Sequence, residues 1–299
     1  MPEPKKTPDK PASSPDRPEA GEGSGGVEIR VEDLHKAFAG RAVLAGVNME
    51  VRAGEMVAIV GASGCGKTVL LNHIIGNLTP DKGRVLVADH ERPGAPLVDL
   101  ATLDEDALDL IRLHWAVVFQ KNALFSGTVY ENIALWLREN QRMTREQILP
   151  RARAALRAVG FKDDEEILDK DRDELSGGMA KRVAVARALS MEPMLMFYDE
   201  PTTGLDPYHA AMIHELIVVT HELPRPGGRR GTTVIITHDK DLLRRLRPRI
   251  VMLHEGTVFF DGPFEQFERN DSEIIRPYFA TMEALHLRDR EPPAPALGA

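Results

Sequence analysis

One short segment has the residue types and the spacing that can hold a phosphate group. It consists of Gly61, Ala62, Ser63, Gly64, Cys65, Gly66, Lys67 and Thr68, and it fits the phosphate-loop pattern between a strand and a helix. Glycines let backbone N–H groups curl around phosphate oxygens, and the start of the following helix adds a favourable dipole. Lys67 can reach the terminal phosphates of a nucleotide, and the Thr68 hydroxyl can bind Mg²⁺.

An apolar run that ends in two acids can act on metal ions and on water. Met194–Tyr198 is followed directly by Asp199 and Glu200. The ends of strands are where α/β sheets place their ligands. Asp199 therefore suits a Mg²⁺ ligand, often through water, and Glu200 suits the polarisation of an attacking water molecule.

A second glycine-containing turn precedes a helical stretch that begins near Ala180. Leu175–Met179 places the hydroxyl of Ser176 and two glycines at a helix start, an arrangement that favours anions. A Ser-Gly-Gly segment alone is a weak signal. The segment becomes a candidate phosphate-binding turn because the phosphate loop and the paired acids occur in the same chain.

The elements that must position these motifs have the pattern of an α/β layer. Met56–Val60 is a continuous apolar run, which is typical of a strand covered on both faces. Comparable runs occur at Leu195–Tyr198, Val234–Thr237 and Ile250–Leu253. The stretches between these runs are expected to be helical. Val27–Val31 and Asn48–Val51 alternate with period two, which predicts half-buried strands.

The middle of the chain, about residues 103–190, is expected to be mostly helical and to form an insert within the α/β frame. Thr144 and Gln147 have the spacing of a capping box, which satisfies two otherwise unpaired N–H groups. Pro150 follows soon after and is expected to end or kink that first turn. Residues 1–26 are rich in proline and glycine with almost no apolar residues, so we expect a disordered tail.

Composition excludes several classes of protein. The chain has 299 residues, 42% of them hydrophobic, and a formal net charge of −8. Its one cysteine, Cys65, excludes an internal disulfide framework and a cysteine-based zinc site. No apolar stretch reaches the roughly 20 residues of a membrane-spanning helix, and no secretory signal is expected. The acidic balance argues against a dedicated nucleic-acid binder.

Together these motifs closely resemble those of the ATP-binding cassette (ABC) family. The resemblance covers about Val27 to Gly262 and includes LSGGM at Leu175–Met179, where the family usually has LSGGQ. It also includes DEPTTGLDP from Asp199 to Pro207, VFQ ending at Gln120, and ITHD from Ile236 to Asp239. It implies an α/β fold with a P-loop NTPase core of the RecA type and an inserted helical subdomain.

The resemblance also implies roles for individual residues. Glu200, His238 and Gln120 would be catalytic. Phe38 would stack on adenine, the loop Gly61–Thr68 would hold the phosphates, and Asp206 would lie in the loop that links two sites. The turn Ser176, Gly177 and Gly178 would hold the γ-phosphate of ATP bound to a second copy. Mg²⁺ would be bound by Thr68, Gln120 and Asp199.

The same resemblance implies an organisation and a set of partners. Residues 1–26 would be the tail, residues 27–262 the cassette, and residues 263–299 a C-terminal helical extension and tail. In the extension, apolar residues recur at helical spacing at Ile275, Tyr278, Phe279, Met282 and Leu285. Two cassettes, arranged head to tail, would hold two ATP molecules and drive separate permease chains from the cytoplasmic face of the inner membrane.

Similarities in shorter segments of the sequence indicate which cargo to expect. LSGGM followed by Ala180-Lys181-Arg182 resembles the phospholipid-transport cassettes of the Mla/Mce type, as do Asn122–Phe125, Val129–Ala134 and Leu137–Glu139. This implies lipid transport through a bacterial envelope, with a lipid-binding Mce-type protein as a further partner and no nucleic acid. An importer cassette for another substrate and a soluble, nucleic-acid-linked ABC ATPase stay open as alternatives. The basic residues of Pro224–Thr233 are expected to form a solvated loop or to touch anionic headgroups.

Overall fold

The computed structural model describes residues 26–121, 124–162, 164–225 and 228–276 of the chain. The expected tail before Gly26 lies outside these ranges, as do four positions of the expected C-terminal extension: Tyr278, Phe279, Met282 and Leu285. Within the described ranges, no helix has both the length and the apolar character that a membrane crossing requires.

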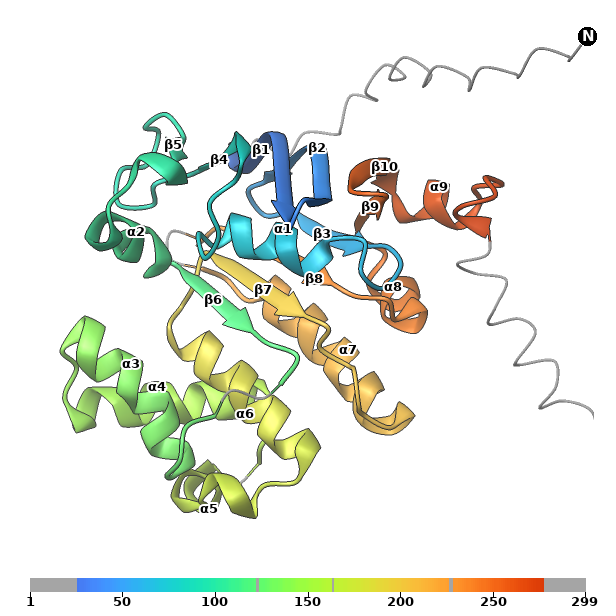
Figure 1. The fold of residues 1–299 in the computed structure, drawn as a ribbon. Helices are drawn as coiled ribbons and strands as arrows, with labels where there is room; N and C mark the ends of the chain where they lie inside the picture. The colour runs from blue at the N-terminus through green and yellow to red at the C-terminus, as the bar shows by residue number, and fades with distance from the viewer. Residues whose placement is uncertain (1–25, 122–123, 163, 226–227, 277–299) are drawn as a thin grey trace, which may run out of the picture.

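A mostly parallel sheet forms the centre of the molecule (Figure 1). In spatial order it contains β10 (Thr257–Pro263), β9 (Arg249–His254), β3 (Met56–Val60), β8 (Thr232–Ile236), β7 (Leu195–Asp199) and β6 (Trp115–Val118). β3 pairs in parallel with both β8 and β9. Val57–Val60 have no exposed surface, as expected for an apolar run covered on both faces. The four predicted buried strands are therefore confirmed.

The parallel strands bring four candidate segments to one edge of this sheet. β3 is followed directly by the phosphate loop, and β7 is followed directly by Glu200. The segment with His238 follows β8, and the segment with Gln120 follows β6. Because these four strands are parallel, their carboxyl ends lie at the same edge. The sheet therefore gathers residues that are far apart in the sequence.

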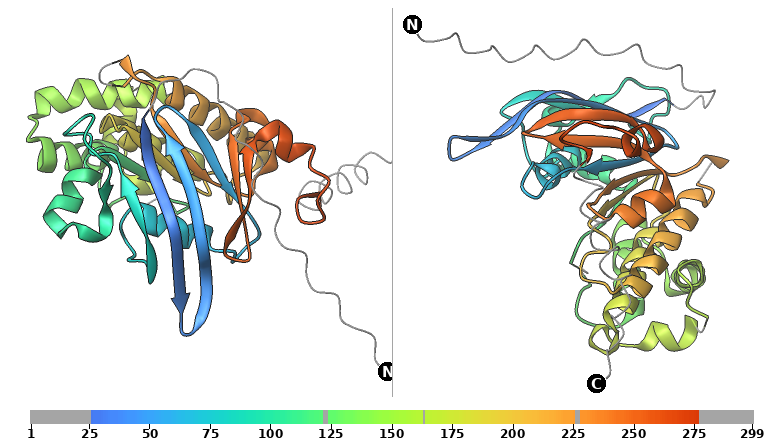
Figure 2. Two further views of the ribbon diagram at one scale, coloured as in Figure 1. Left: turned by 90° about the horizontal axis from the view of Figure 1, so that it is seen from above. Right: turned by 90° about the vertical axis from the view of Figure 1, so that its right-hand side faces the viewer.

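An antiparallel sheet covers one face of the main sheet. Its strands are β2 (Arg41–Arg52), β1 (Val27–Phe38), β4 (Lys82–Val87) and β5 (Val98–Asp99), in that order. The β1–β2 hairpin projects beyond the rest of the fold (Figure 2). Helix α1 (Lys67–Ile74) packs between the sheets, where Leu70 and Ile74 share one core with Ile29 of β1 and Val57 of β3. This packing fixes the start of α1 beside the edge that carries the candidate residues.

The expected helical insert forms a group of its own beside the main sheet (Figure 1). It contains α3 (Val129–Gln141), α4 (Arg145–Ala158), α5 (Asp164–Asp169) and α6 (Gly177–Ser190), packed around a common apolar core. The predicted segment 103–190 also includes α2 (Glu105–Arg112) and β6. Because β6 pairs with β7 in the main sheet, the part that consists of helices starts later, at Val129.

Helix α4 confirms one local prediction and contradicts another. The capping box forms, and the Thr144 N–H donates to Gln147 Oε1 at 2.9 Å. Pro150 lies inside the helix, which continues to Ala158, so one of the two outcomes expected of this proline, an end of the helix, is wrong. The buried face that includes Ile148 and Ala152 packs into the core of the helical group, and this packing outweighs the missing N–H of the proline.

The remaining helices are α7 (Pro207–Glu222), α8 (Lys240–Leu246) and α9 (Phe264–Glu268). Beyond α9, Ile275 is buried against Phe264 and Phe267. The loop after α7 corrects one part of an expectation, because Arg225 is not a solvated side chain, whereas Arg229 and Arg230 are exposed as expected. It is only 6% exposed, and its Nη2 donates to the Thr220 carbonyl oxygen at 2.9 Å.

Candidate functional site

A cavity of about 640 Å³ opens where the four segments meet at the edge of the main sheet. It is lined by Val43, Gly61, Ala62, Ser63, Gly64, Gly66, Lys67, Thr68, Val69, Gln120, Glu200 and His238. Seven of these residues come from the predicted phosphate loop, and the three predicted catalytic residues join them. The fold thus brings together groups that the sequence places up to 177 positions apart, from Gly61 to His238.

Two glycines of the phosphate loop are required by its backbone. The φ angle of Gly61 is +146°, and a Cβ there would lie 2.4 Å from the carbonyl oxygen of Leu253. Gly66 has a φ of +106°, and a Cβ there would lie 2.8 Å from Cδ2 of Leu44. Residues with a side chain rarely adopt such angles and would also clash here. The loop therefore reaches α1, whose first N–H groups can receive an anion.

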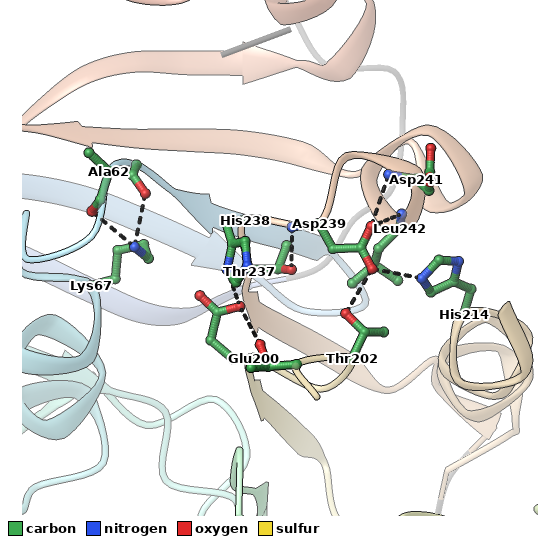
Figure 3. A network of polar contacts seen from close by, with 12 residues as sticks. Ala62, Lys67, Glu200, Thr202, His214, Thr237, His238, Asp239, Asp241 and Leu242 are labelled. Atoms are coloured by element: carbon green, nitrogen blue, oxygen red, sulfur yellow. Dashed lines mark hydrogen bonds and ion pairs between the residues drawn. The ribbon is translucent and has the colours of Figure 1, made fainter. Parts of the chain in front are cut away.

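Lys67 is held at the cavity by the loop itself (Figure 3). The side chain is buried, and Nζ donates to the carbonyl oxygens of Gly61 at 2.9 Å and Ala62 at 3.1 Å. A cation at a helix N-terminus attracts phosphate oxygens strongly, because both the charge and the helix dipole favour an anion. Thr68 follows in the first turn of α1 and lines the same cavity.

Glu200 and His238 contact each other at the cavity (Figure 3). Glu200 Oε2 lies 2.7 Å from His238 Nδ1. The backbone of Glu200 is strained, with a φ of +46°, and its N–H donates to the carbonyl oxygen of Ile236 at 2.9 Å. Strain of this kind persists where the surroundings fix the residue, and it is common at active sites. A carboxylate beside an imidazole is an arrangement that can polarise water.

Asp199, the last residue of β7, directly precedes Glu200 but does not itself line the cavity. Its Oδ1 is buried and has no hydrogen-bond partner among the described residues. Burial, and to a smaller degree Glu200, raises the pKa of Asp199, whereas Lys181 and Lys67 oppose this shift. A buried carboxylate oxygen of this kind suits Mg²⁺, which binds through one or two carboxylates, phosphates and water. The described ranges contain no group of three metal-binding His, Cys, Asp or Glu residues.

A network that the sequence analysis missed supports the cavity from behind (Figure 3). The Asp239 carboxylate accepts hydrogen bonds from Thr202 Oγ1 at 2.7 Å and from His214 Nε2 at 3.0 Å. It also accepts the backbone N–H groups of Asp241 and Leu242. Burial alone would raise the pKa of Asp239, but these hydrogen bonds lower it to about 2. The network connects the loops after β7 and β8 to α7, and no spacing in the sequence marks His214 as a member of it.

The predicted residues of the second turn lie apart from the cavity. Ser176 caps α6, and its Oγ accepts the Met179 N–H at 3.3 Å. A Cβ on Gly178 would lie 2.5 Å from Cδ2 of His209, and His209 Nδ1 contacts Asp206 Oδ2 at 2.5 Å. This second group therefore comprises Ser176, Gly177, Gly178 and Asp206, joined through His209. None of the four lines the cavity of the same chain.

Two further predicted binding residues, Phe38 and Cys65, do not line the cavity either. Phe38 ends β1 at the projecting hairpin, is 44% exposed, and has Lys36 Nζ 5.6 Å from its ring centre. The cavity wall contains Val43 and Val69 instead. Both are ordinary apolar residues in the sequence, so no pattern marks them as lining residues.

Comparison with known proteins decides the family. Residues 44–203, more than half of the chain, match the protein family described as ABC transporter. This chain belongs to the ABC transporter family. Among its relatives, the histidine transport ATP-binding protein HisP of Pseudomonas aeruginosa is 37% identical over 257 residues, covering 84% of this chain and 97% of HisP. Protein TRIGALACTOSYLDIACYLGLYCEROL 3, chloroplastic, of Arabidopsis thaliana is 34% identical, covering 85% of this chain and 74% of that protein.

Solved structures confirm the predicted fold of the cassette. The cbiO1 protein of Clostridium perfringens, part of the ABC transporter complex cbiONQ, superposes with a TM-score of 0.69 at 30% identity, covering 88% and 99% of the two chains. A dimeric ATP-binding cassette with bound ADP and Pi superposes with a TM-score of 0.66 at 30% identity, covering 79% and 98%. The cassette therefore has a mixed α/β fold with a P-loop NTPase core, and it is an ATP-binding ATPase subunit of a transporter.

Proposed function

We propose that this cassette hydrolyses ATP at the cavity and powers lipid transport through separate permease subunits. The observation that carries the proposal is the meeting of Lys67, Glu200 and His238 at one cavity. Lys67 and the start of α1 would hold the terminal phosphates of ATP. Glu200 would polarise the attacking water, while His238 would orient the carboxylate and face the γ-phosphate. Because the transition state of phosphoryl transfer is loose, catalysis consists mainly of such positioning and of charge stabilisation.

Mg²⁺ would be held by Thr68, Gln120 and Asp199. When bound, the cation would neutralise developing negative charge on the phosphates. The buried, unpartnered Oδ1 of Asp199 supports this assignment. Gln120 lines the cavity at the end of β6, so it would both approach the cation and align the attacking water.

A second copy of the cassette would complete each ATP site. Ser176, Gly177 and Gly178 lie away from the cavity of their own chain, which supports a role at the cavity of a partner. Asp206 would join the two sites, because His209 links it to this turn. The exposed ring of Phe38 would stack on adenine. The related cassette solved as a dimer with ADP and Pi supports the same arrangement.

The proposed cargo is a phospholipid or a related lipid. The motif similarity to Mla/Mce-type cassettes supports this choice, and one relative at 34% identity bears the name of a galactolipid. The cassette would sit on the cytoplasmic face of the inner membrane, beneath its permease and together with a lipid-binding Mce-type protein. A second candidate is an amino-acid importer, because HisP, named for histidine transport, is 37% identical.

Replacement of one carboxylate tests the catalytic assignment. Glu200→Gln should bind ATP as the parent does but hydrolyse it about 10²- to 10⁴-fold more slowly, since it loses the group that polarises water. Nucleotide binding and phosphate release, measured on the same preparations, check this expectation. Glu105→Gln, at the exposed start of α2, is the matched control and should keep parental activity. ATPase activity of Glu200→Gln within tenfold of the parent would reject the assignment.

A reconstituted system tests the cargo. The cassette is co-purified with its permease and placed in proteoliposomes that contain labelled phospholipid, with histidine uptake measured in parallel. ATP-dependent lipid transfer that disappears with Glu200→Gln supports the proposal. Histidine uptake without lipid transfer would replace it with the importer, and co-purification with DNA or ribosomes instead of a membrane protein would contradict both.

A further inference from the structure

A buried lysine connects the helical group to the cavity. Lys181 belongs to α6 and is only 2% exposed. Its Nζ donates to the carbonyl oxygen of Phe119 at 2.9 Å and to that of Gln120 at 3.1 Å. These two carbonyls belong to the segment that leaves β6 and carries the Gln120 side chain to the cavity. One ammonium group thus holds the backbone of a candidate catalytic residue.

The energetics indicate that this contact is specific. The ammonium group of Lys181 is buried and donates to two backbone carbonyl oxygens. A buried cation is costly unless hydrogen bonds satisfy it. An apolar side chain of similar length, such as Met, would fill the same volume without that cost. What a cation contributes here, and an apolar side chain cannot, is therefore the pair of hydrogen bonds to the two carbonyl oxygens.

The position of Lys181 on α6 places it close to the Ser-Gly-Gly turn. It follows Gly177 by four residues, which is about 6 Å along a helix axis at 1.5 Å per residue. Between the turn and Lys181, Met179 and Ala180 are partly buried against the core of the helical group, and beyond Lys181 the α6 residues Val183 and Ala186 are completely buried. A displacement of the turn therefore moves Lys181 with it, because a packed helix shifts as a unit.

We infer that Lys181 is a positioning residue that transmits displacements of the Ser176–Met179 turn to Gln120 at the cavity of the same chain. The inference rests on the proposed function, in which the turn holds the ATP of a second copy while Gln120 serves its own cavity. Lys181 then links the two ATP sites of a dimer. ATP bound against the turn of one cassette would set the position of Gln120 in that cassette and hence its rate of hydrolysis.

Three variants test this inference. Lys181→Met removes the two hydrogen bonds and keeps the volume, whereas Lys181→Arg keeps a cation that can reach carbonyl oxygens. Arg182→Met is the matched control, because Arg182 lies next to Lys181 on α6 but stacks on Phe161. Measurements comprise kcat, KM for ATP, the Hill coefficient and the melting temperature of each full-length variant.

The expected pattern separates positioning from simple structural support. Lys181→Met should lower kcat about 10- to 100-fold with KM little changed, because misplacement of a catalytic group affects turnover more than ground-state binding. Its Hill coefficient should fall from above 1 toward 1, since the two sites lose their link. Lys181→Arg should recover most of kcat and cooperativity, and Arg182→Met should resemble the parent.

Other outcomes overturn the inference without touching the proposed function. If the parent is active, Glu200→Gln is inactive and Lys181→Met behaves like Arg182→Met, then Lys181 does not position Gln120. A fall in activity that follows the melting temperature equally in Lys181→Met and Lys181→Arg would also reject it, because both would then be folding defects. If Lys181→Met does not fold, a Lys181→Arg variant that folds but has lost cooperativity would reject it too. An inactive parent would instead reject the proposed function.

Discussion

Asp239 joins three elements behind the cavity through a single carboxylate. Its oxygens accept hydrogen bonds from Thr202 in the loop after β7 and from His214 of α7. They also accept hydrogen bonds from the first backbone N–H groups of α8. Its neighbour in the chain, His238, contacts Glu200. The carboxylate therefore fixes the loop that carries one member of the candidate catalytic pair, although it does not line the cavity itself.

The ionisation of Asp239 predicts a pH dependence of stability. Its pKa in the folded protein is lowered from 3.8 to about 2. The ionised group therefore stabilises the fold above about pH 4, and this contribution, on the order of 2 kcal/mol, is lost as the pH falls toward 2. In urea unfolding, Asp239→Asn should be less stable than the parent at pH 7, and the difference should narrow by pH 3. The control Asp106→Asn, on exposed α2, should show no such narrowing, and a constant difference for Asp239→Asn would contradict the assignment.

At the scale of residues, the sequence identified groups that belong to motifs and missed those that act through the fold. Lys67, Glu200 and His238 follow strands at recognisable spacings and meet at the cavity. Lys181 and His214 have no such signal, because their partners lie more than twenty residues away in the sequence. Only the packing of α6 and α7 in the folded protein shows which groups these two side chains contact.

At the scale of elements, α4 contains a residue that weakens it. Pro150 has no N–H to donate within the helix, yet the helix runs from Arg145 to Ala158. We predict that Pro150→Ala raises the free energy of unfolding by about 1 kcal/mol or more, because alanine restores the hydrogen bond and is the best helix former. The melting temperature should rise by about 2–4 °C per kcal/mol.

A second proline is the matched control for this prediction. Pro207 lies in the first turn of α7, where a missing N–H costs little. Pro207→Ala should therefore give no comparable increase in calorimetric melting temperature. An equal gain at both sites, or no gain at Pro150, would show that the proline does not strain α4.

The elements themselves were predictable where a pattern was local. The apolar runs gave β3, β7, β8 and β9 with boundaries within two residues, because burial on both faces demands uninterrupted apolar residues. Two expectations failed in part, for tertiary reasons. Packing of α4 in the core of the helical group keeps it helical beyond Pro150. Arg225 is buried because it donates a hydrogen bond to a backbone carbonyl oxygen of α7.

At the scale of the whole molecule, the separation of the cavity from the Ser-Gly-Gly turn predicts complementation between defective copies. Lys67→Ala damages the cavity, and Ser176→Arg damages the turn. In a head-to-tail dimer of one variant with the other, one site is doubly damaged and the other is intact. An equimolar mixture should therefore recover up to about a quarter of the parental ATPase sites, whereas each variant alone recovers none.

The control for complementation is a chain that carries both substitutions. Mixed with Lys67→Ala, this double variant cannot form an intact site, so the mixture should stay inactive. Activity in that mixture, or none in the mixture of single variants at concentrations where they associate, would contradict the shared site. Cross-linking of the mixtures establishes that association.

The residues that line the cavity come from β2, from α1 and from the segments that follow β3, β6, β7 and β8, so they extend from Val43 to His238 in the sequence. A nascent chain therefore cannot gain nucleotide affinity gradually as it leaves the ribosome. The phosphate loop emerges early, but its opposite wall follows only after the stretch that contains His238 has been synthesised. Capture of ATP thus reports synthesis of the chain through His238, and the nucleotide then stabilises the fold through its own binding free energy.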